Sequence, residues 1–255
     1  MKAIMELRNV NMTYQSPNGE IHALKDINFT VSDGEFVCIV GPSGCGKSTL
    51  LSIISGLLAP TSGNIILNGE ILNGPSRKIG YMLQKDHLFE WRTILKNVLL
   101  GVEIQKAVTP EIKEKAIQFL QTYGLYEFCD KYPDQLSGGM RQRAALIRTL
   151  VTDPQILLLD EAFSALDYQT RLAVSDDIYR IIKKEKKTAI LVTHDISEAI
   201  SMADRVLVFS HRPGTVKKVY DIVLTCQWRT PLNSREAPEF RHYFHEIWRE
   251  LDIHV

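Results

Sequence analysis

The distribution of apolar residues along the chain predicts a mixed α/β protein. Four short apolar runs have the length and composition of buried strands: residues 36–40, 156–159, 189–192 and 206–209. Because these runs are continuous rather than alternating, they favour a parallel sheet that is covered on both faces. Apolar and polar residues alternate over residues 27–32 instead, which predicts a half-buried antiparallel strand nearer the N-terminus.

Helical signals occupy the middle and the end of the chain. Thr109-Pro110-Glu111 combines an N-cap residue, a first-turn proline and a first-turn acid, and apolar residues follow at helical spacing. Further helices are predicted after Ser137 and from Pro238 onward. With the strands, this pattern predicts an α/β core of the P-loop NTPase (RecA-like) type with an N-terminal antiparallel β subdomain and an inserted α-helical subdomain.

A phosphate-binding loop follows the first apolar run. The pattern G-x-x-x-x-G-K-[ST] is matched in full by Gly41, Pro42, Ser43, Gly44, Cys45, Gly46, Lys47 and Ser48, and a helical run from Thr49 to Leu58 comes next. Backbone amides and the helix N-terminus would face the phosphates of ATP. Lys47 is expected to contact the β- and γ-phosphates, and Ser48 to bind Mg²⁺. The same amides and Lys47 predict a lowered pKa for the Cys45 thiol.

Two adjacent acids end the second apolar run. Asp160 and Glu161 directly follow residues 156–159, and ligands of doubly wound sheets bind beyond the carboxyl ends of the strands. Asp160 is therefore expected to hold Mg²⁺, directly or through water. Glu161 is the candidate to orient and deprotonate the attacking water.

A second glycine-rich helix start lies about ninety residues after the phosphate loop. The string Leu136–Arg143, LSGGMRQR, places Ser137, Gly138 and Gly139 at a helix N-terminus, which is a suitable anion site. This string resembles the signature sequence of ATP-binding-cassette (ABC) ATPases.

Other segments resemble that family in the same order from about residue 5 to residue 209. The resemblance implies that Tyr14 stacks on adenine, and that Gln84 senses Mg²⁺ and faces a membrane partner. It implies that residues 164–167, which end at Asp167, form the segment called the D-loop, and that His194 contacts the γ-phosphate. It also implies a single nucleotide-binding domain over residues 1–228, with the helical subdomain at about 86–152, and a C-terminal helical extension over 229–255.

The resemblance further implies that ATP is bound between two copies of the chain. The signature turn of one copy would cover the γ-phosphate held by the phosphate loop of the other. Physical chemistry agrees, because one helix N-terminus offers only about half a positive charge, and two opposed termini with Lys47 neutralise a triphosphate better.

Composition narrows the possible partners. Lys plus Arg number 30, as do Asp plus Glu, so net charge gives no support for a nucleic-acid partner. The longest apolar run, residues 50–59, is too short to span a bilayer, and no secretory signal is evident. The four cysteines form no C-x-x-C pair. Taken with these observations, the resemblance to ABC ATPases implies that the chain lies at the cytoplasmic face of the membrane, on separate permease subunits served by a substrate-binding protein.

Local sequences favour one importer class, although other classes stay open. Residues 73–76, 86–93 and 212–214 resemble segments of nitrate/sulfonate/taurine-type cassettes, with Glu90 where their usual form has proline. Many importer relatives have proline where this chain has Ala162. Phe89 and Trp91 are expected at the permease surface, one of them partly packed inside the insert. The alternatives are an iron–sulfur-assembly ABC ATPase and a small-molecule P-loop kinase.

Overall fold

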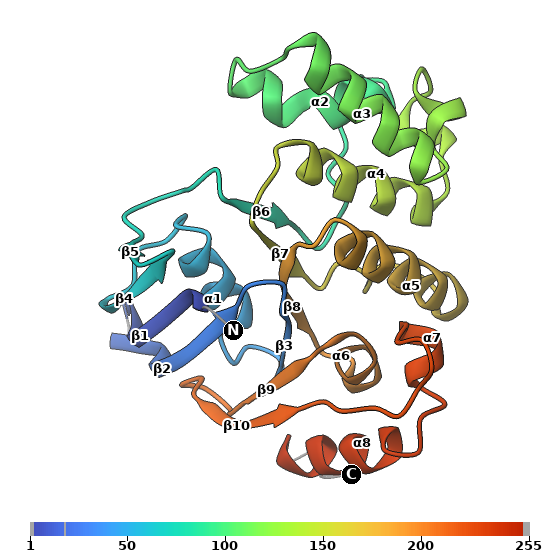
Figure 1. The fold of residues 1–255 in the computed structure, drawn as a ribbon. Helices are drawn as coiled ribbons and strands as arrows, with labels where there is room; N and C mark the ends of the chain where they lie inside the picture. The colour runs from blue at the N-terminus through green and yellow to red at the C-terminus, as the bar shows by residue number, and fades with distance from the viewer. Residues whose placement is uncertain (1–2, 18, 252–255) are drawn as a thin grey trace.

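The fold consists of two sheets with helices between and around them. The computed structural model describes residues 3–17 and 19–251. In Figure 1 the sheet of β1, β2, β4 and β5 lies to the left, and the helices α2, α3 and α4 lie at the top. Of the C-terminal helices, α7 lies at the lower right and α8 at the bottom. The larger sheet runs between these layers, and the predicted mixed α/β class is confirmed.

The larger sheet contains six strands in the order β10-β9-β3-β8-β7-β6. Neighbouring strands from β9 to β6 are parallel, and β10 is antiparallel to β9. The strands are β3 (Phe36–Val40), β6 (Ile79–Met82), β7 (Ile156–Asp160), β8 (Thr188–Thr193), β9 (Arg205–Phe209) and β10 (Val216–Asp221). All four predicted runs are strands of this sheet. The two edge strands, β6 and β10, were not predicted, since neither has a continuous apolar run.

Both faces of this sheet are buried, which explains the continuous apolar runs. In β3, Val37 and Ile39 belong to the core cluster shared with α1 (Lys47–Ile54) and the antiparallel sheet. Phe36, Cys38 and Val40 belong to the cluster on the other face, which includes α5 (Tyr168–Lys184) and α6 (Ile196–Met202).

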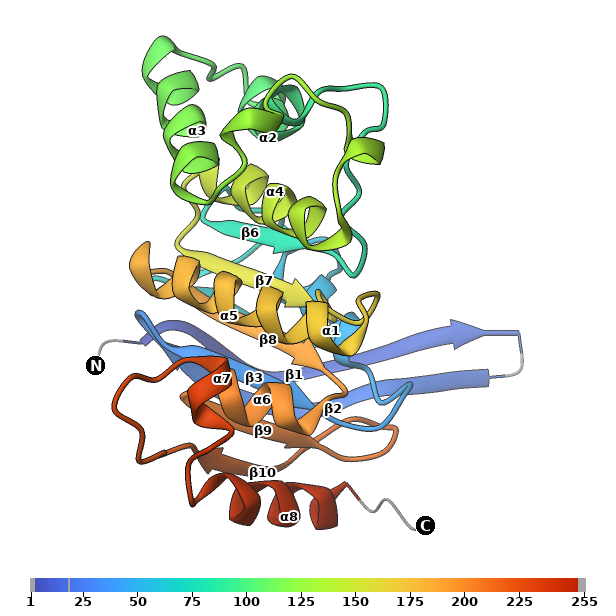
Figure 2. The same ribbon diagram turned by 90° about the vertical axis from the view of Figure 1, so that its right-hand side faces the viewer.

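The N-terminal sheet is antiparallel, as residues 27–32 predicted. Its order is β2-β1-β4-β5, and its strands are β1 (Ala3–Ser16), β2 (Gly19–Ser32), β4 (Ser62–Leu67) and β5 (Glu70–Ile71). Figure 2 shows that the β1–β2 hairpin extends well beyond the rest of the molecule. Tyr14 lies near the outer end of this hairpin, paired with Ile21.

The helical layer is inserted between β6 and β7. It contains α2 (Ile94–Ile104), α3 (Pro110–Thr122), short 3₁₀ turns at Tyr126–Phe128 and Pro133–Gln135, and α4 (Gly138–Val151). The predicted start of α3 is confirmed, because the Thr109 side chain accepts a hydrogen bond from the Ile112 amide. The predicted start of α4 is also confirmed.

The helix after the phosphate loop is shorter than predicted. α1 ends at Ile54 rather than Leu58. Gly56 has φ +77°, and a Cβ at this position would lie 2.2 Å from the Gly74 carbonyl oxygen. The chain therefore leaves the helix here to pass close to another backbone segment, which helical spacing alone does not reveal.

The C-terminal segment returns along α5 and α6. It forms α7 (Pro231–Ser234), which packs on both helices, and α8 (Phe240–Glu250), which packs on α6. The helix predicted from Pro238 begins two residues later, and α7 was not predicted. Over residues 3–17 and 19–251, no helix combines the length and apolar character needed to cross a membrane.

Candidate ATP-binding and hydrolysis site

Parallel strands bring the candidate residues to one edge of the sheet. β3 leads into the phosphate loop, β7 ends at Asp160, β8 ends at Thr193 just before His194, and β6 ends two residues before Gln84. Because parallel strands point the same way, their carboxyl ends share one edge, where ligands of such sheets bind.

The phosphate loop curls around the Lys47 side chain. The Lys47 Nζ atom donates hydrogen bonds to the carbonyl oxygens of Gly41 (2.8 Å) and Pro42 (2.9 Å), and the residue is 7% exposed. At the first turn of α1, Gly46 has φ +105° and no side chain caps the helix amides. These amides remain available to an anion, with the ammonium group beside them.

Asp160 connects the phosphate loop to β6. Its carboxylate accepts hydrogen bonds from the Ser48 hydroxyl (3.3 Å) and from the Tyr81 hydroxyl (3.2 Å). Burial raises the pKa of Asp160, and these two hydrogen bonds oppose the rise. Burial and the neighbouring Asp160 carboxylate likewise raise the pKa of Tyr81, so Tyr81 stays a donor at neutral pH.

Glu161 lies at the centre of a second group of side chains. Its carboxylate is 3.3 Å from His194 Nδ1 and 3.5 Å from Gln84 Nε2. Gln84 Nε2 also donates to the Ser164 hydroxyl at 3.2 Å. Glu161 has φ +45°, an uncommon backbone conformation that turns it out of the strand direction directly after β7. The carboxylate, imidazole and amide can together hold a water molecule.

A cavity of about 540 Å³ contains the phosphate loop and Glu161. Its wall is formed by Tyr14, Ile21, Ala23, Ser43, Gly44, Gly46, Lys47, Ser48, Thr49, Glu161 and Arg212. Tyr14 is 39% exposed, and its hydroxyl lies 3.3 Å from the Thr49 hydroxyl. An exposed ring above a phosphate loop can stack on a purine.

The signature residues do not line this cavity. Gly138 borders a different cavity, together with Asp86, Arg141 and Leu166. Ser137 caps α4 by accepting a hydrogen bond from the Met140 amide (3.3 Å). Asp167 caps α5 by accepting from the Thr170 amide (3.1 Å), and this contact to Thr170 lowers the pKa of Asp167. The structure therefore separates the two predicted anion sites within one chain.

The expected lowering of the pKa of the Cys45 thiol is wrong. The residue is 1% exposed and packs in the apolar cluster beneath the antiparallel sheet. Burial raises the pKa of its thiol, although Lys47 nearby opposes the shift. The backbone of Cys45 belongs to the phosphate loop, but its side chain points into the core, which favours an inert thiol.

Three residues of the site were not assigned to it from the sequence. Tyr81 and Ser164 contact Asp160 and Gln84, and Arg212 lines the cavity. In the sequence, Arg212 is part only of residues 212–214, which resemble a segment of one importer class. The two residues in each of these contacts are separated by between 79 and 168 positions in the sequence, so no local pattern indicates them.

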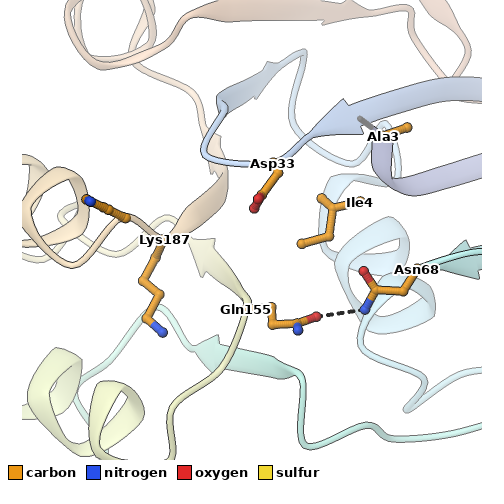
Figure 3. Close-up of a pocket in the computed structure, with 7 residues that line it drawn as sticks. Ala3, Ile4, Asp33, Asn68, Gln155 and Lys187 are labelled. Atoms are coloured by element: carbon orange, nitrogen blue, oxygen red, sulfur yellow. Dashed lines mark hydrogen bonds between the residues drawn. The ribbon is translucent and has the colours of Figure 1, made fainter. Parts of the chain in front are cut away.

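A second cavity lies at the opposite edge of the sheet (Figure 3). Gln155 and Lys187 on its wall directly precede β7 and β8, so it faces the amino ends of these strands. Three of its polar side chains form hydrogen bonds: Asn68 donates to Gln155 (2.7 Å), and Lys187 donates to Asp153 (2.8 Å). The hydrogen bond between Asn68 and Gln155 joins the two sheets.

The fold and this site define an ATP-binding cassette. Residues 24–164 match the sequence model of the ABC transporter family, and the chain belongs to that family. It is thus an ATP-binding subunit and an ATPase, which excludes the small-molecule kinase alternative.

Individual relatives cover most of the chain. The taurine import ATP-binding protein TauB of Pelagibacter ubique is 44% identical over 84% of this chain and 82% of its own. The nitrate import ATP-binding protein NrtD of Synechocystis is 40% identical over 95% of this chain and 93% of its own. Among solved structures, the ATP-binding cassette MJ0796, a dimer in a post-hydrolysis state bound to ADP and Pi, superposes with a TM-score of 0.73. It is 34% identical and covers 86% of this chain and 99% of its own.

Proposed function

We propose that this chain powers an importer of the nitrate/sulfonate/taurine-like class from the cytoplasmic face of the membrane. The names of TauB and NrtD support import rather than iron–sulfur assembly. Permease subunits bind the ATPase directly in this proposal, and a substrate-binding protein delivers the cargo to them. The nucleotide-binding domain spans residues 1–228, with a helical subdomain at about 86–152 and a C-terminal extension over 229–255.

In the proposed reaction, Glu161 orients a water molecule and accepts its proton as the water oxygen attacks the γ-phosphorus of ATP. The bond from that phosphorus to the β–γ bridging oxygen breaks, and ADP and phosphate are released. The contacts of its carboxylate with His194 and Gln84 support this role, because they hold the carboxylate at the cavity wall. Lys47 and the loop amides stabilise negative charge on the departing phosphate oxygens. Tyr14 stacks on the adenine.

Mg²⁺ fits the pair formed by Ser48 and Asp160. Both offer oxygen ligands, and their oxygens lie 3.3 Å apart at the start of α1. The partly buried Asp160 carboxylate, whose pKa is raised by burial, would regain favourable charge interactions from a cation. The metal would supply positive charge that offsets the negative charge of the ATP phosphates. Gln84 contacts Glu161 and Ser164 rather than this pair, so its part in metal binding requires a different side-chain orientation.

The ATP site is proposed to be complete only in a dimer. The observation that carries this proposal is the separation of Ser137, Gly138 and Gly139 from the cavity around Lys47. A second copy can bring its own signature turn over that cavity. The dimeric state of MJ0796 supports the arrangement. Asp167 would lie close to the dimer interface.

The permease surface is proposed at Phe89 and Trp91. Their rings stack at 4.8 Å between centroids, and they are 37% and 75% exposed, so neither is packed inside the insert as expected for one of them. Asn97 beneath them is fully buried and bonds to the backbone of Phe89 in both directions. A rigidly held, exposed aromatic pair is suited to an interface.

The same segment is tied to the signature helix. Arg148 of α4 donates to the carbonyl oxygens of Asp86 and His87, each at 2.7 Å. Arg141 of α4 pairs with the Asp86 carboxylate at 3.1 Å. A movement of the permease against this surface would therefore move α4, which begins at the signature turn.

Trp91→Ala tests the importer function. The subunit is reconstituted with its permease in liposomes, and the ATPase rate is compared with and without loaded binding protein. The variant should keep the basal ATPase rate of the isolated subunit and lose most of its stimulation. Trp228→Ala is the matched control, because Trp228 is 71% exposed elsewhere on the surface. Stimulation equal to wild type would remove Trp91 from the coupling surface, and ATP-driven efflux by wild type would contradict the importer assignment.

A further inference from the structure

The loop between β9 and β10 contacts the phosphate loop from outside. Arg212 in this loop donates two hydrogen bonds to the Gly44 carbonyl oxygen, from Nε at 3.1 Å and from Nη2 at 3.0 Å. Gly44 is the fourth residue of the phosphate loop, so the guanidinium group binds the outer turn of that loop.

The loop that carries Arg212 is itself firmly held. Ser210 accepts from the Thr215 amide with its hydroxyl (3.0 Å) and donates to the Thr215 carbonyl with its amide (3.0 Å). Gly214 exchanges hydrogen bonds with β2, donating to Ala23 and accepting from Lys25, both at 2.9 Å. Arg212 is therefore presented by a rigid connection rather than by a free surface arm.

Close packing joins this connection to the phosphate loop. A Cβ on Gly214 would lie 2.2 Å from the Cys45 carbonyl oxygen. A Cβ on Gly46 would lie 2.9 Å from the Ala23 carbonyl oxygen of β2. The phosphate loop thus packs against β2 and against the β9–β10 connection. The hydrogen bonds from Arg212 add a contact at Gly44, in the outer turn of the loop.

Arg212 also contributes positive charge to the nucleotide cavity. The charged side chains on the cavity wall are Lys47, Arg212 and Glu161. Without Arg212, one cation and one anion would remain, and they would offset each other. A triphosphate needs a positive surplus, and a guanidinium group is suited to phosphate oxygens.

We propose that Arg212 is a nucleotide-positioning residue: it fixes the Gly44 turn of the phosphate loop and adds positive charge to the rim of the nucleotide cavity. The proposal rests on the ATP site described above. It assigns the β9–β10 connection to the ATP site, whereas in the sequence residues 212–214 show only a resemblance to one importer class.

Binding measurements on the isolated chain test this role. Dissociation constants for MgATP, MgADP and adenosine are measured by calorimetry for wild type, Arg212→Ala, Arg212→Lys and Arg212→Gln. Arg212→Ala should raise the constants for MgATP and MgADP by roughly tenfold, about 1.4 kcal/mol, and leave adenosine unchanged. Arg212→Gln should match Arg212→Ala. Arg212→Lys should recover part of the loss, because it keeps the charge without the two-pronged contact.

Kinetics and a neighbouring control separate positioning from general damage. The kcat at saturating ATP should stay within about twofold of wild type while KM rises, as expected for uniform binding. His211→Ala, an exposed neighbour in the same loop, should bind all three ligands like wild type. Equal losses for adenosine and MgATP, or MgATP binding by Arg212→Ala within twofold of wild type, would overturn the proposal.

Two further measurements keep the result interpretable. Thermal unfolding shows whether Arg212→Ala folds. If it does not, Arg212→Lys becomes the deciding variant, and a dissociation constant for MgATP equal to that of wild type overturns the proposal. Lys47→Ala reports on the site itself. If Lys47→Ala binds MgATP like wild type, the assignment of the ATP site fails, whereas strong loss with Lys47→Ala and none with Arg212→Ala refutes the role of Arg212 alone.

Discussion

The two glycine-rich helix starts of this chain differ in how their first amides are satisfied. At α1, Gly46 is left-handed and offers no side chain, so the amides stay available to a ligand. At α4, Ser137 is extended and its hydroxyl already accepts from the Met140 amide. The first start is built to bind phosphate within its own chain. The second is stable without a ligand, which suits a surface that meets ATP only when another copy brings it.

The largest effect that tests this comparison is expected at Glu161. Glu161→Gln should lower kcat by roughly a thousandfold, because the amide cannot accept the proton of the attacking water. ATP binding should persist, and MgATP should then hold two copies together in size-exclusion chromatography. Glu127→Gln, an exposed residue of the helical layer, is the control. A variant that binds ATP and stays monomeric at saturation would contradict the two-copy site.

A pair of variants separates the two helix starts directly. In the Glu161→Gln background, Lys47→Ala should weaken ATP binding by roughly 10- to 100-fold, since it removes the charged donor beside the phosphates. Ser137→Arg in the same background should bind ATP within about twofold of the parent but form no dimer. Calorimetry and size-exclusion chromatography give the two readings. Equal loss of ATP binding in both variants would mean that one chain uses both starts for the same nucleotide.

Tyr14→Ala examines the cavity wall at the outer end of the β1–β2 hairpin. Loss of base stacking should raise KM for ATP by roughly tenfold. The kcat should change less, because stacking is equal in the ground state and the transition state. Steady-state kinetics over a range of ATP concentrations gives both values. Tyr126→Ala, an exposed tyrosine in the helical layer, should change neither.

The smallest effect is expected at Cys45, beneath the first helix start. Its pKa is raised by burial, so at pH 8 less of it is thiolate than in a free cysteine, and alkylation should be slow. The rate of alkylation should keep rising with pH instead of levelling off above pH ~8.5, as it would for a free cysteine. Inactivation by an alkylating reagent, with and without ATP, measures this. Fast inactivation at neutral pH that disappears in Cys45→Ser would show an activated thiol.

The sequence predicted those parts of the molecule that depend on neighbouring residues. The phosphate loop, the acids after β7 and the helix start at Ser137 are contiguous motifs, and the structure has the expected strand or helix beside each. The parts that were missed depend on contacts between distant segments. Arg212 contacts Gly44 across 168 positions, and α1 ends early because Gly56 meets Gly74.

The pKa shift of Cys45 was predicted in the wrong direction for a related reason. Its charged neighbour is visible in the sequence, but the direction of its side chain is not. The structure turns the thiol into the apolar core, where desolvation outweighs the nearby ammonium group. Sequence motifs therefore locate the backbone of this site more reliably than they describe the electrostatic environment of each side chain.

The place of β6 at the margin of the larger sheet has a dynamic consequence. β6 is hydrogen-bonded to β7 on one side and has no strand on the other among the described residues, whereas β7 and β8 are each held from both sides. Local opening of β6 therefore breaks one ladder of hydrogen bonds instead of two, and its amides should exchange with deuterium before those of β7 and β8. Gln84 lies two residues after the end of β6, so the segment that joins the aromatic surface to Glu161 is attached to a strand at the edge of the sheet. A small free energy of opening at β6 would let this segment move when the aromatic surface or the ATP site changes, without disturbing the rest of the sheet.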